Sequence, residues 1–183
     1  ADGKVLWSKP TEKDNGRGLA ADIDPRHPGA ENWALNAPEL FNAKGEVAAP
    51  ARPKHVNFAI WWDGDLLREL LDVTTIYKWD WNNNTSVPLL VTEGTSSNNG
   101  TKANPALSAD LFGDWREELI LRATDNQSLR IYSTNIPTDI GLTTLMQDPQ
   151  YRVAIAWQNT AYNQPPHPSF YLGDGMKPAP KNQ

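Results

Sequence analysis

The chain has 183 residues, of which 39% are hydrophobic and 21% are charged, so it is long enough to bury the core of one ordinary domain. Its formal net charge of −5 argues against nucleic acid as a partner. It contains no run of about 18 apolar residues that would span a membrane. The absence of cysteine excludes disulfides, thiolate metal sites and a cysteine nucleophile. With 15 Pro and 12 Gly, the chain is rich in turns, which favours short strands over long helices.

Three segments of the chain resemble one another. Each has an apolar lead-in, an Asp, a second Asp shortly after it, a Glu and then an apolar strand. The three segments are Leu19–Leu35, Phe58–Leu71 and Leu107–Leu121. Their first aspartates, Asp22, Asp63 and Asp110, lie about 40 to 50 residues apart, and a period in that range is typical of propeller blades or another repeat array.

After each repeated loop the sequence predicts strands joined by hairpin turns. The expected strands are Glu31–Ala37, Leu40–Asn42, Thr74–Trp81, Val87–Thr92, Glu117–Ala123 and Leu129–Ser133. A short helix is expected near Tyr151–Gln158, and Asp2–Ser8 is interpreted as the outer hairpin strand of an earlier blade. The prediction is an all-β chain of about three to four propeller blades over residues 1–175, with a flexible tail at residues 176–183. Because a closed propeller typically needs about four to eight blades, we expect the chain to be the C-terminal part of a larger protein or one piece of a nicked one.

The repeated loops carry carboxylates in a pattern that suits calcium, which binds about six to eight oxygen ligands from a flexible loop. We expect one site at the first loop and one at the third, with candidate ligands Asp22, Asp24 and Glu31, and Asp110, Asp114 and Glu118 or Glu117. The second loop, with Asp63, Asp65 and Glu69, is a weaker candidate because Leu66 and Leu67 crowd it with apolar side chains. The competing interpretation is ordinary Asp turns and caps ahead of strands, and repetition in register favours metal at the first and third loops.

Several residues in loops rich in Gly, Pro and Asn are candidates for chemistry. Lys102 lies in the turn-forming segment Asn98–Pro105, and Arg17 lies between two glycines just ahead of the first carboxylate loop. Tyr162 and His167 bracket the sequence Asn-Gln-Pro-Pro, whose prolines suit a precise binding surface or a structural tie equally well. For the lysine and the arginine, exposed surface or plain turn chemistry is the competing interpretation. The eight tryptophans are better suited to core packing than to stacking on sugars.

Five segments, in unbroken order along the chain, resemble the family 11 rhamnogalacturonan lyases. The five segments are Gly16–Arg26, Asn57–Leu71, Ala109–Glu118, Asp148–Arg152 and Ala156–His167. The chain resembles only the C-terminal portion of those enzymes. The resemblance implies a secreted, calcium-rich enzyme whose fold is an eight-bladed β-propeller, of which this chain holds the C-terminal blades.

The resemblance also implies a β-elimination in the backbone of rhamnogalacturonan I, a pectic polysaccharide. The bond that joins rhamnose to O4 of galacturonate breaks, and a 4,5-unsaturated uronate remains. The difficult step is removal of the C5 proton next to a carboxylate, so the site must neutralise that carboxylate with calcium or a cationic side chain. A base then takes the proton, and an acid protonates the leaving oxygen.

Lys102, Tyr162 and Arg17 match the family positions that we assign to the catalytic cleft. The resemblance implies that Lys102 is the base or a carboxylate neutraliser, that Arg17 clamps a uronate carboxylate, and that Tyr162 donates to or accepts from the glycosidic oxygen. The substrate-binding candidates are Asn104, Asn163 and His167.

The expected partners are the pectic substrate and the N-terminal remainder of the same propeller, in one chain or as a separate chain. Two other interpretations are open: a non-catalytic calcium-dependent carbohydrate-binding module, and a purely structural propeller fragment. A binding module retains pectin without producing unsaturated ends. A structural fragment is stabilised by calcium but not by pectin.

Overall fold

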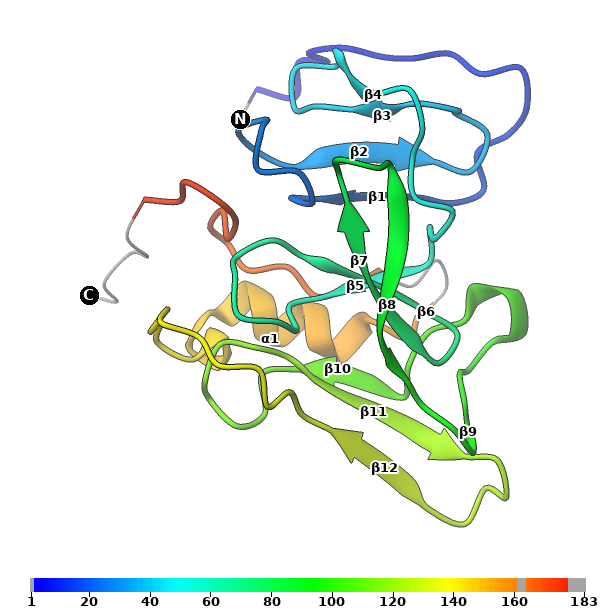
Figure 1. Ribbon diagram of the computed structural model, residues 1–183, viewed down its shortest axis with the longest axis vertical. Coiled ribbons are helices and arrows are strands. Elements are labelled where there is room, and N and C mark those ends of the chain that lie inside the picture. The colour runs from blue at the N-terminus through cyan, green and yellow to red at the C-terminus, as the bar shows by residue number, and fades with distance from the viewer. Residues whose placement is uncertain (1, 161–163, 178–183) are drawn as a thin grey trace.

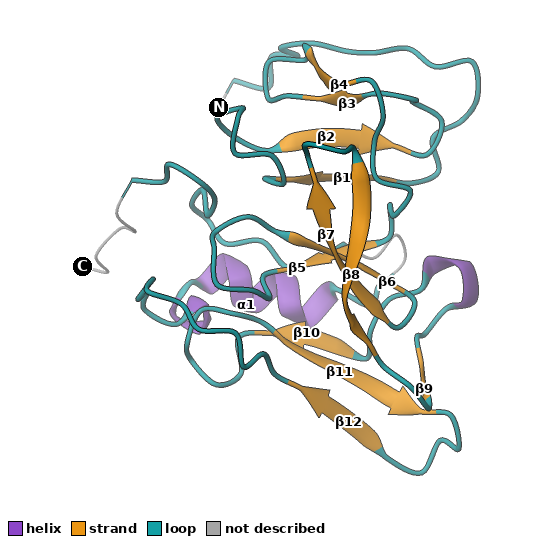
Figure 2. Cartoon of the chain, in the orientation of Figure 1, coloured by secondary structure: helices purple, strands orange, loops and turns teal. Residues whose placement is uncertain are grey.

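The computed structural model describes residues 2–160 and 164–177. Within these residues the chain forms three four-stranded sheets, all with antiparallel pairing, and one short α-helix (Figures 1 and 2). The prediction of a mainly β chain with a single short helix is therefore confirmed. No helix in the described part of the chain is long and apolar enough to cross a lipid bilayer.

The first two sheets are meanders, in which strands pair in chain order. The first sheet contains β1 (Gly18–Ala21), β2 (Glu31–Ala34), β3 (Leu40–Phe41) and β4 (Val47–Ala49). The second contains β5 (Phe58–Ile60), β6 (Glu69–Asp72), β7 (Thr75–Asp80) and β8 (Thr85–Val91). The third contains β10 (Leu107–Ala109), β11 (Glu118–Ala123) and β12 (Leu129–Tyr132), with β9 (Thr95–Ser96) paired to the end of β11. Most strands are thus close to the positions that the sequence predicted or the repeat implied, but the short strands β4 and β9 were not predicted.

Strands β5 and β6 of the second sheet are buried on both faces, which places this sheet between the other two. Successive residues of a strand point to opposite faces of a sheet. Leu70 accordingly enters the core that the second sheet shares with the first, whereas Leu71 enters the core shared with the third. Trp79 and Ile76 on β7 divide in the same way. The sheets are therefore stacked in chain order, with the second in the middle (Figure 1).

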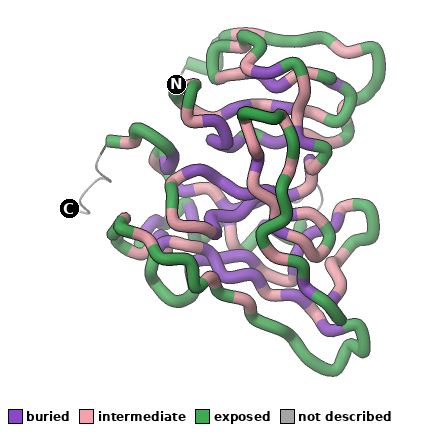
Figure 3. The backbone as a smooth tube through the Cα atoms, in the orientation of Figure 1, coloured by how far each residue is buried: buried purple, intermediate pink, exposed green. Residues whose placement is uncertain are grey.

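Strands β1, β5 and β10 are the inner strands of their sheets, and all three begin at one end of the stack and finish at the other. The outer strands β8 and β12 are mostly exposed (Figure 3). At the starting end, Arg17 donates to Asn57 and to the backbone of Lys102. At the finishing end, the N–H of Arg68 donates to the carbonyl of Asp22 at 2.7 Å. Because a strand rises about 3.3 Å per residue, the two ends lie roughly 10 to 13 Å apart along these short strands.

The α-helix α1 (Pro149–Trp157) begins at Asp148, whose side chain accepts two backbone N–H groups of the first turn at 2.8 and 3.3 Å. Proline occupies the first helical position, where no N–H is needed. Tyr151 is fully buried and packs with Trp61 and Trp115 in a third core beneath the loops. Beyond the helix, the amide of Gln158 bonds to both the N–H and the carbonyl of Ser108, which fixes the helix against β10.

The predicted strand at Asp2–Ser8 is wrong, because residues 2–17 form no strand. A strand is stabilised by hydrogen bonds to a neighbouring strand, and the earlier blade to which this segment was assigned is not among the three sheets. A side chain holds the segment instead. Trp7 packs on Phe41 with ring centroids 5.9 Å apart and donates its indole N–H to the carbonyl of Ala43 at 3.2 Å.

Candidate functional site

A glutamate opens the second strand of each sheet and organises the loop before it. Glu31, Glu69 and Glu118 pair across the ladder with the last residues of β1, β5 and β10. In every case one carboxylate oxygen accepts two successive backbone N–H groups of the loop, at 2.8 to 3.2 Å. Charged hydrogen bonds of this kind hold a loop firmly. The repeated glutamate therefore has a structural role in all three loops.

The ladder pairs also correct the register of the sequence repeat. Asp22 and Asp110 directly follow their inner strands, but Trp61 takes this position in the second repeat. Asp63 is therefore equivalent to Asp24 rather than to Asp22. The alignment of the three repeats from the sequence was wrong because it matched the first aspartate of each loop. The equivalent positions are set by the strand pairing instead.

The first carboxylate loop holds two buried oxygens that have no hydrogen-bond partner, Oδ1 of Asp22 and Oε1 of Glu31. The other oxygen of Asp22 accepts from the hydroxyl of Tyr171 and the N–H of Asp174, both at 2.6 Å. Burial, assisted by neighbouring carboxylates, raises the pKa of Asp22 to about 6 and that of Glu31 to about 8. The loop thus places acidic groups close together where little water reaches them, which disfavours their charged forms.

Asp24, the third predicted ligand of this loop, is held by a cationic side chain. Its carboxylate accepts from Nε and Nη2 of Arg26 at 2.8 and 2.6 Å, so both oxygens have a partner. Desolvation raises its pKa, but the bonds from Arg26 outweigh that effect and leave the pKa below its usual value. Of the three predicted ligands, Asp22 and Glu31 retain an oxygen suited to a cation.

The second loop brings its three carboxylates together, although its sequence made it the weakest metal candidate. Oxygens of Asp63, Asp65 and Glu69 lie within 4.8 Å of one another. The ammonium group of Lys78 contacts all three, at 2.7 Å from Asp65 and 3.1 Å from Glu69. Leu67 turns into the core instead of crowding the carboxylates. A side-chain cation thus occupies the centre of this acidic group.

In the third loop the predicted carboxylates are used by protein donors. Asp110 accepts from the N–H of Gly113 through one oxygen and from two donors at Thr144 and Leu145 through the other, each at 2.8 Å. Asp114 pairs with Arg116 at 2.6 Å. The free oxygen of Glu118 accepts from the hydroxyl of Ser133 at 3.2 Å. Metal binding at this loop remains a prediction, and it would have to displace or share these bonds.

A buried ionic network joins the second and third sheets to α1. Arg68 and Glu117 are both almost fully buried and form an ion pair at 3.5 Å. The hydroxyl of Tyr151 donates to Glu117 at 2.7 Å and accepts from the N–H of Asp110 at 3.0 Å. The Arg68 guanidinium also stacks on the ring of Trp61, 3.9 Å from its centroid. Sequence reasoning missed this network, since nothing in the local pattern distinguishes Arg68 from a solvated strand-end arginine.

His167, a predicted substrate-binding residue, belongs to this network. Its Nδ1 lies 3.2 Å from a guanidinium nitrogen of Arg68 and therefore accepts a hydrogen bond. Burial, and then the charge of Arg68, lowers the pKa of His167 to about 3. His167 lines a cavity of about 100 Å³ together with Asp22 and Trp61. It therefore lies at the end of the sheets where the carboxylate loops are found.

Two of the three predicted catalytic residues meet at the other end of the sheets. Nη2 of Arg17 donates to the carbonyl of Asn57 at 3.0 Å and to the carbonyl of Lys102 at 3.3 Å. Lys102 ends a 3₁₀ turn, Gly100–Lys102, between Asn99 and Ala103, which both adopt left-handed backbone conformations with φ of 58° and 49°. Such strained residues persist only where the surrounding structure fixes them, and they are common at functional sites.

The remaining predicted site residues divide between described and undescribed parts of the chain. Asn104 is fully buried, and its amide bonds to the side chains of Asn99 and Asn159, so it fixes the Lys102 loop. Tyr162 and Asn163 lie outside the described residues.

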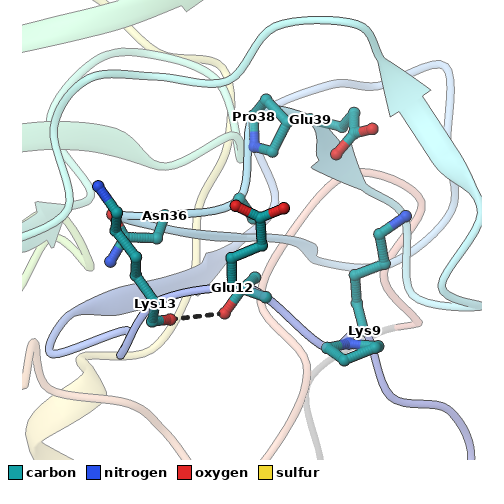
Figure 4. Close-up of a pocket in the computed structure, with 9 residues that line it drawn as sticks. Lys9, Glu12, Lys13, Asn36, Pro38 and Glu39 are labelled. Atoms are coloured by element: carbon teal, nitrogen blue, oxygen red, sulfur yellow. Dashed lines mark hydrogen bonds between the residues drawn. The ribbon is translucent and has the colours of Figure 1, made fainter.

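A pocket of about 490 Å³ lies between the N-terminal segment and the first sheet, and Figure 4 shows its lining. Lysines and glutamates alternate there, with Lys9 and Lys13 beside Glu12 and Glu39. None of the predicted catalytic or metal residues is among those that line it. The mixed charge gives no preference for an anionic polymer.

Comparison with known proteins identifies the family and the relatives that the chain resembles. Residues 1–182 match the family described as "Rhamnogalacturonan lyase family 11, C-terminal domain". The chain is 58% identical over 181 residues to "Rhamnogalacturonan endolyase YesW" of Bacillus subtilis (strain 168), covering 99% of this chain and 29% of that protein. It is 51% identical over 194 residues to "Rhamnogalacturonan exolyase YesX" of the same organism, covering 98% of this chain and 32% of that protein.

Solved structures agree with these sequence matches. The crystal structure of YesW at 1.40 Å resolution superimposes with a TM-score of 0.93 at 58% identity, over 97% of this chain and 30% of that chain. A Bacillus licheniformis rhamnogalacturonan lyase gives a TM-score of 0.92 at 55% identity, over 96% of this chain and 30% of that chain. The chain thus spans about a third of the length of these relatives.

Proposed function

Because the chain belongs to the family 11 rhamnogalacturonan lyases, as their C-terminal domain, we propose that it forms part of a secreted lyase that cleaves the backbone of rhamnogalacturonan I. The observation that carries this proposal is the meeting of Arg17 with the Lys102 turn, from two segments 85 residues apart in sequence. Arg17 would supply the cation that neutralises the uronate carboxylate and Lys102 the amine that accepts the C5 proton, and the two residues precede inner strands of the first and third sheets. The chain covers only about 30% of its relatives, so the complete enzyme supplies the rest of the cleft.

We place the three sheets as consecutive blades of an eight-bladed β-propeller. Support comes from the stacking of the sheets face to face in chain order, with the inner strands side by side. A propeller has this arrangement in each sector, since its blades pack through their faces around a central axis. In this arrangement the two ends of the inner strands open on opposite faces of the propeller. The Arg17 end then faces the substrate cleft, and the carboxylate loops face away from it.

The proposed chemistry follows from the weak acidity of the uronate C5–H bond. Arg17 pairs with the substrate carboxylate and offsets the charge that develops there when the proton leaves. Lys102 removes the C5 proton, the C4–O4 bond breaks and a double bond forms between C4 and C5. Tyr162 protonates O4 as it departs with the rhamnose side of the chain. Burial lowers the pKa of Arg17 and nearby Asp72 opposes that effect, so the guanidinium remains a cation.

Calcium is proposed for the first carboxylate loop. Asp22 and Glu31 each offer a buried oxygen without a hydrogen-bond partner, which fits a hard cation that prefers carboxylate ligands. When bound there, calcium would neutralise the loop and stabilise the blade. The loop lies at the far end of the strands from Arg17, so this role is structural and not catalytic.

The test is carried out on the complete lyase that contains this chain. Release of 4,5-unsaturated uronate from rhamnogalacturonan I is followed by ultraviolet absorbance. Lys102→Ala should lower kcat by about a hundredfold or more, which is the usual contribution of a general base. Lys44→Ala, at an exposed turn, is the matched control and should retain full activity. A Lys102→Ala enzyme that turns over at the parent rate would overturn the assignment, and a complete protein that binds the polymer without producing unsaturated ends would be a binding module.

A further inference from the structure

Behind Arg17 lies a chain of hydrogen bonds that neither the sequence motifs nor the proposed reaction takes into account. One edge of the Arg17 guanidinium is taken up by a single residue, Asn57. Nε donates to the side-chain oxygen of Asn57 at 3.2 Å, and Nη2 donates to its backbone carbonyl at 3.0 Å. A planar guanidinium bound through two acceptors on one edge has a fixed orientation. Nη2 also donates to the carbonyl of Lys102 at 3.3 Å, so Asn57 and the Lys102 turn together set the direction of the guanidinium.

The orientation of the Asn57 amide is itself fixed from both sides. Its Nδ2 donates to Oδ1 of Asp72 at 2.7 Å. Arg17 is a donor only, and an ionised Asp72 is an acceptor only, so the amide cannot flip without breaking both bonds. The two residues are neighbours because Asn57 precedes β5 and Asp72 ends β6, one position beyond the Phe58–Leu71 ladder pair.

Asp72 is anchored in turn by His55. Nδ1 of His55 lies 3.2 Å from the second carboxylate oxygen, and its ring stacks on Tyr77 with centroids 4.0 Å apart and planes 16° apart. Burial raises the pKa of Asp72, but the hydrogen bonds from His55 and Asn57 outweigh it and leave the pKa below its usual value. The carboxylate is therefore ionised at neutral pH, as the hydrogen-bond directions require.

We propose that Asn57 and Asp72 are positioning residues, which hold the Arg17 guanidinium in the orientation that receives a uronate carboxylate. This inference rests on the proposed role of Arg17. The neutral amide lies between the guanidinium and Asp72, so the carboxylate orients the cation through Asn57 while its negative charge stays one residue away from the substrate. An aspartate at position 57 would instead place a second negative charge beside the substrate carboxylate.

Substitutions in the complete lyase test the proposal. Asn57→Ala should lower kcat/KM about ten- to a hundredfold, because it removes a hydrogen bond to a charged group that positions the substrate. The isosteric Asp72→Asn should lower kcat/KM about three- to tenfold, since the new amide can donate as well as accept and no longer enforces one orientation. Asn83→Ala, at an exposed hairpin turn, is the matched control and should leave kcat/KM unchanged. The melting temperature of each variant shows whether it is folded.

Chemical rescue separates positioning from folding. Added guanidinium ion should restore part of the activity of Arg17→Ala, because Asn57 still presents its two acceptors. It should not restore activity to the double variant Arg17→Ala/Asn57→Ala. If the double variant is rescued as well as the single one, or if Asn57→Ala has the parent kcat/KM while Arg17→Ala is inactive, the positioning role is overturned. If Arg17→Ala itself is fully active, the proposed function of Arg17 fails instead.

Discussion

Lys78 provides a stringent test of how the second sheet is stabilised. Its ammonium lies among three carboxylates, of which Glu69 is fully buried, Asp63 is 14% exposed and Asp65 is 50% exposed. The half-exposed Asp65 pair contributes little, because water screens it. The Glu69 pair dominates, since replacing Lys78 with methionine leaves a buried carboxylate without its cation. The perturbation is therefore Lys78→Met, which keeps the length of the side chain.

Breaking a buried ion pair costs about 3 to 5 kcal/mol, and partial exposure of Lys78 reduces the expectation to about 2 to 4 kcal/mol. For a domain of this size, 1 kcal/mol shifts the melting temperature by about 2 to 4 °C, so Lys78→Met should unfold roughly 5 to 15 °C below the parent chain. Burial raises the pKa of Glu69 to about 8, although Lys78 opposes that effect. A carboxyl whose pKa is raised on folding stabilises the folded state at low pH, and that contribution is lost as pH rises through the folded pKa. The loss of unfolding free energy in Lys78→Met relative to the parent should therefore be larger at pH 8 than at pH 5.

The assay is thermal unfolding of the chain by circular dichroism, with and without calcium. In Lys78→Met the three carboxylates can accept a divalent cation in place of the ammonium, so calcium should raise the melting temperature more than it does in the parent. Adding Glu69→Gln should remove both the pH dependence and the extra calcium response. Lys44→Met is the control. A Lys78→Met chain that unfolds within about 1 °C of the parent at pH 8 would show that Lys78 does not stabilise the fold through Glu69.

Three further predictions concern the remaining polar groups. Asp22→Asn should abolish the calcium-dependent stabilisation of the parent chain, which would be about 2.7 kcal/mol when calcium is present at a hundredfold excess over Kd. Titration calorimetry that finds unchanged calcium binding would contradict the assignment of Asp22 as a calcium ligand. The pKa of His167 is lowered to about 3, so its contribution to stability is complete above pH 6.5 and is lost as pH falls towards 3. His167→Gln keeps an acceptor for Arg68 and should flatten this dependence in urea unfolding at pH 7, 5 and 4, whereas an unchanged profile would show that another group titrates. Tyr151→Phe should cost about 2 to 4 kcal/mol, because Glu117 and the N–H of Asp110 each lose a buried partner, and a loss below about 1 kcal/mol in the same assay would argue against the network.

The sequence predicted a mainly β chain because the same strand, loop and glutamate pattern recurs three times. An apolar inner strand, an acidic loop and a glutamate recur, and the structure gives each glutamate the same two backbone bonds. The spacing of the aspartates did not reveal the correct alignment of the three repeats, because Trp61 replaces the first aspartate in the second repeat. That alignment depends on ladder register, which follows from packing and turn geometry.

The ranking of the acidic loops shows a second limit of sequence reasoning. Leu66 and Leu67 counted against the second loop, yet Leu67 is buried in the core and leaves the carboxylates free to converge. Lys78 reaches them because β6 and β7 are joined by a two-residue turn, in which Val73 takes φ of 54°. A β-branched residue is rare in that conformation, so the turn carries no signal in the sequence.

The Arg17 site was predicted only in part. The resemblance identified Arg17 and Lys102, and the structure brings their segments into contact. Asn57 and Asp72 carried no signal of their own, because an asparagine before a strand and an aspartate after one are ordinary turn residues. Their partnership with Arg17 arises only when the first two sheets stack.

The proposed lyase activity is tested by measuring ultraviolet absorbance from unsaturated uronate, using the complete lyase with rhamnogalacturonan I and with polygalacturonan as the control. We expect product from rhamnogalacturonan I only, and less of it after chelation if calcium binds the first carboxylate loop as proposed. Intact mass of the purified protein is recorded alongside, so that a nicked enzyme is recognised. A complete, folded protein that releases no unsaturated uronate from rhamnogalacturonan I would rule out the proposed activity.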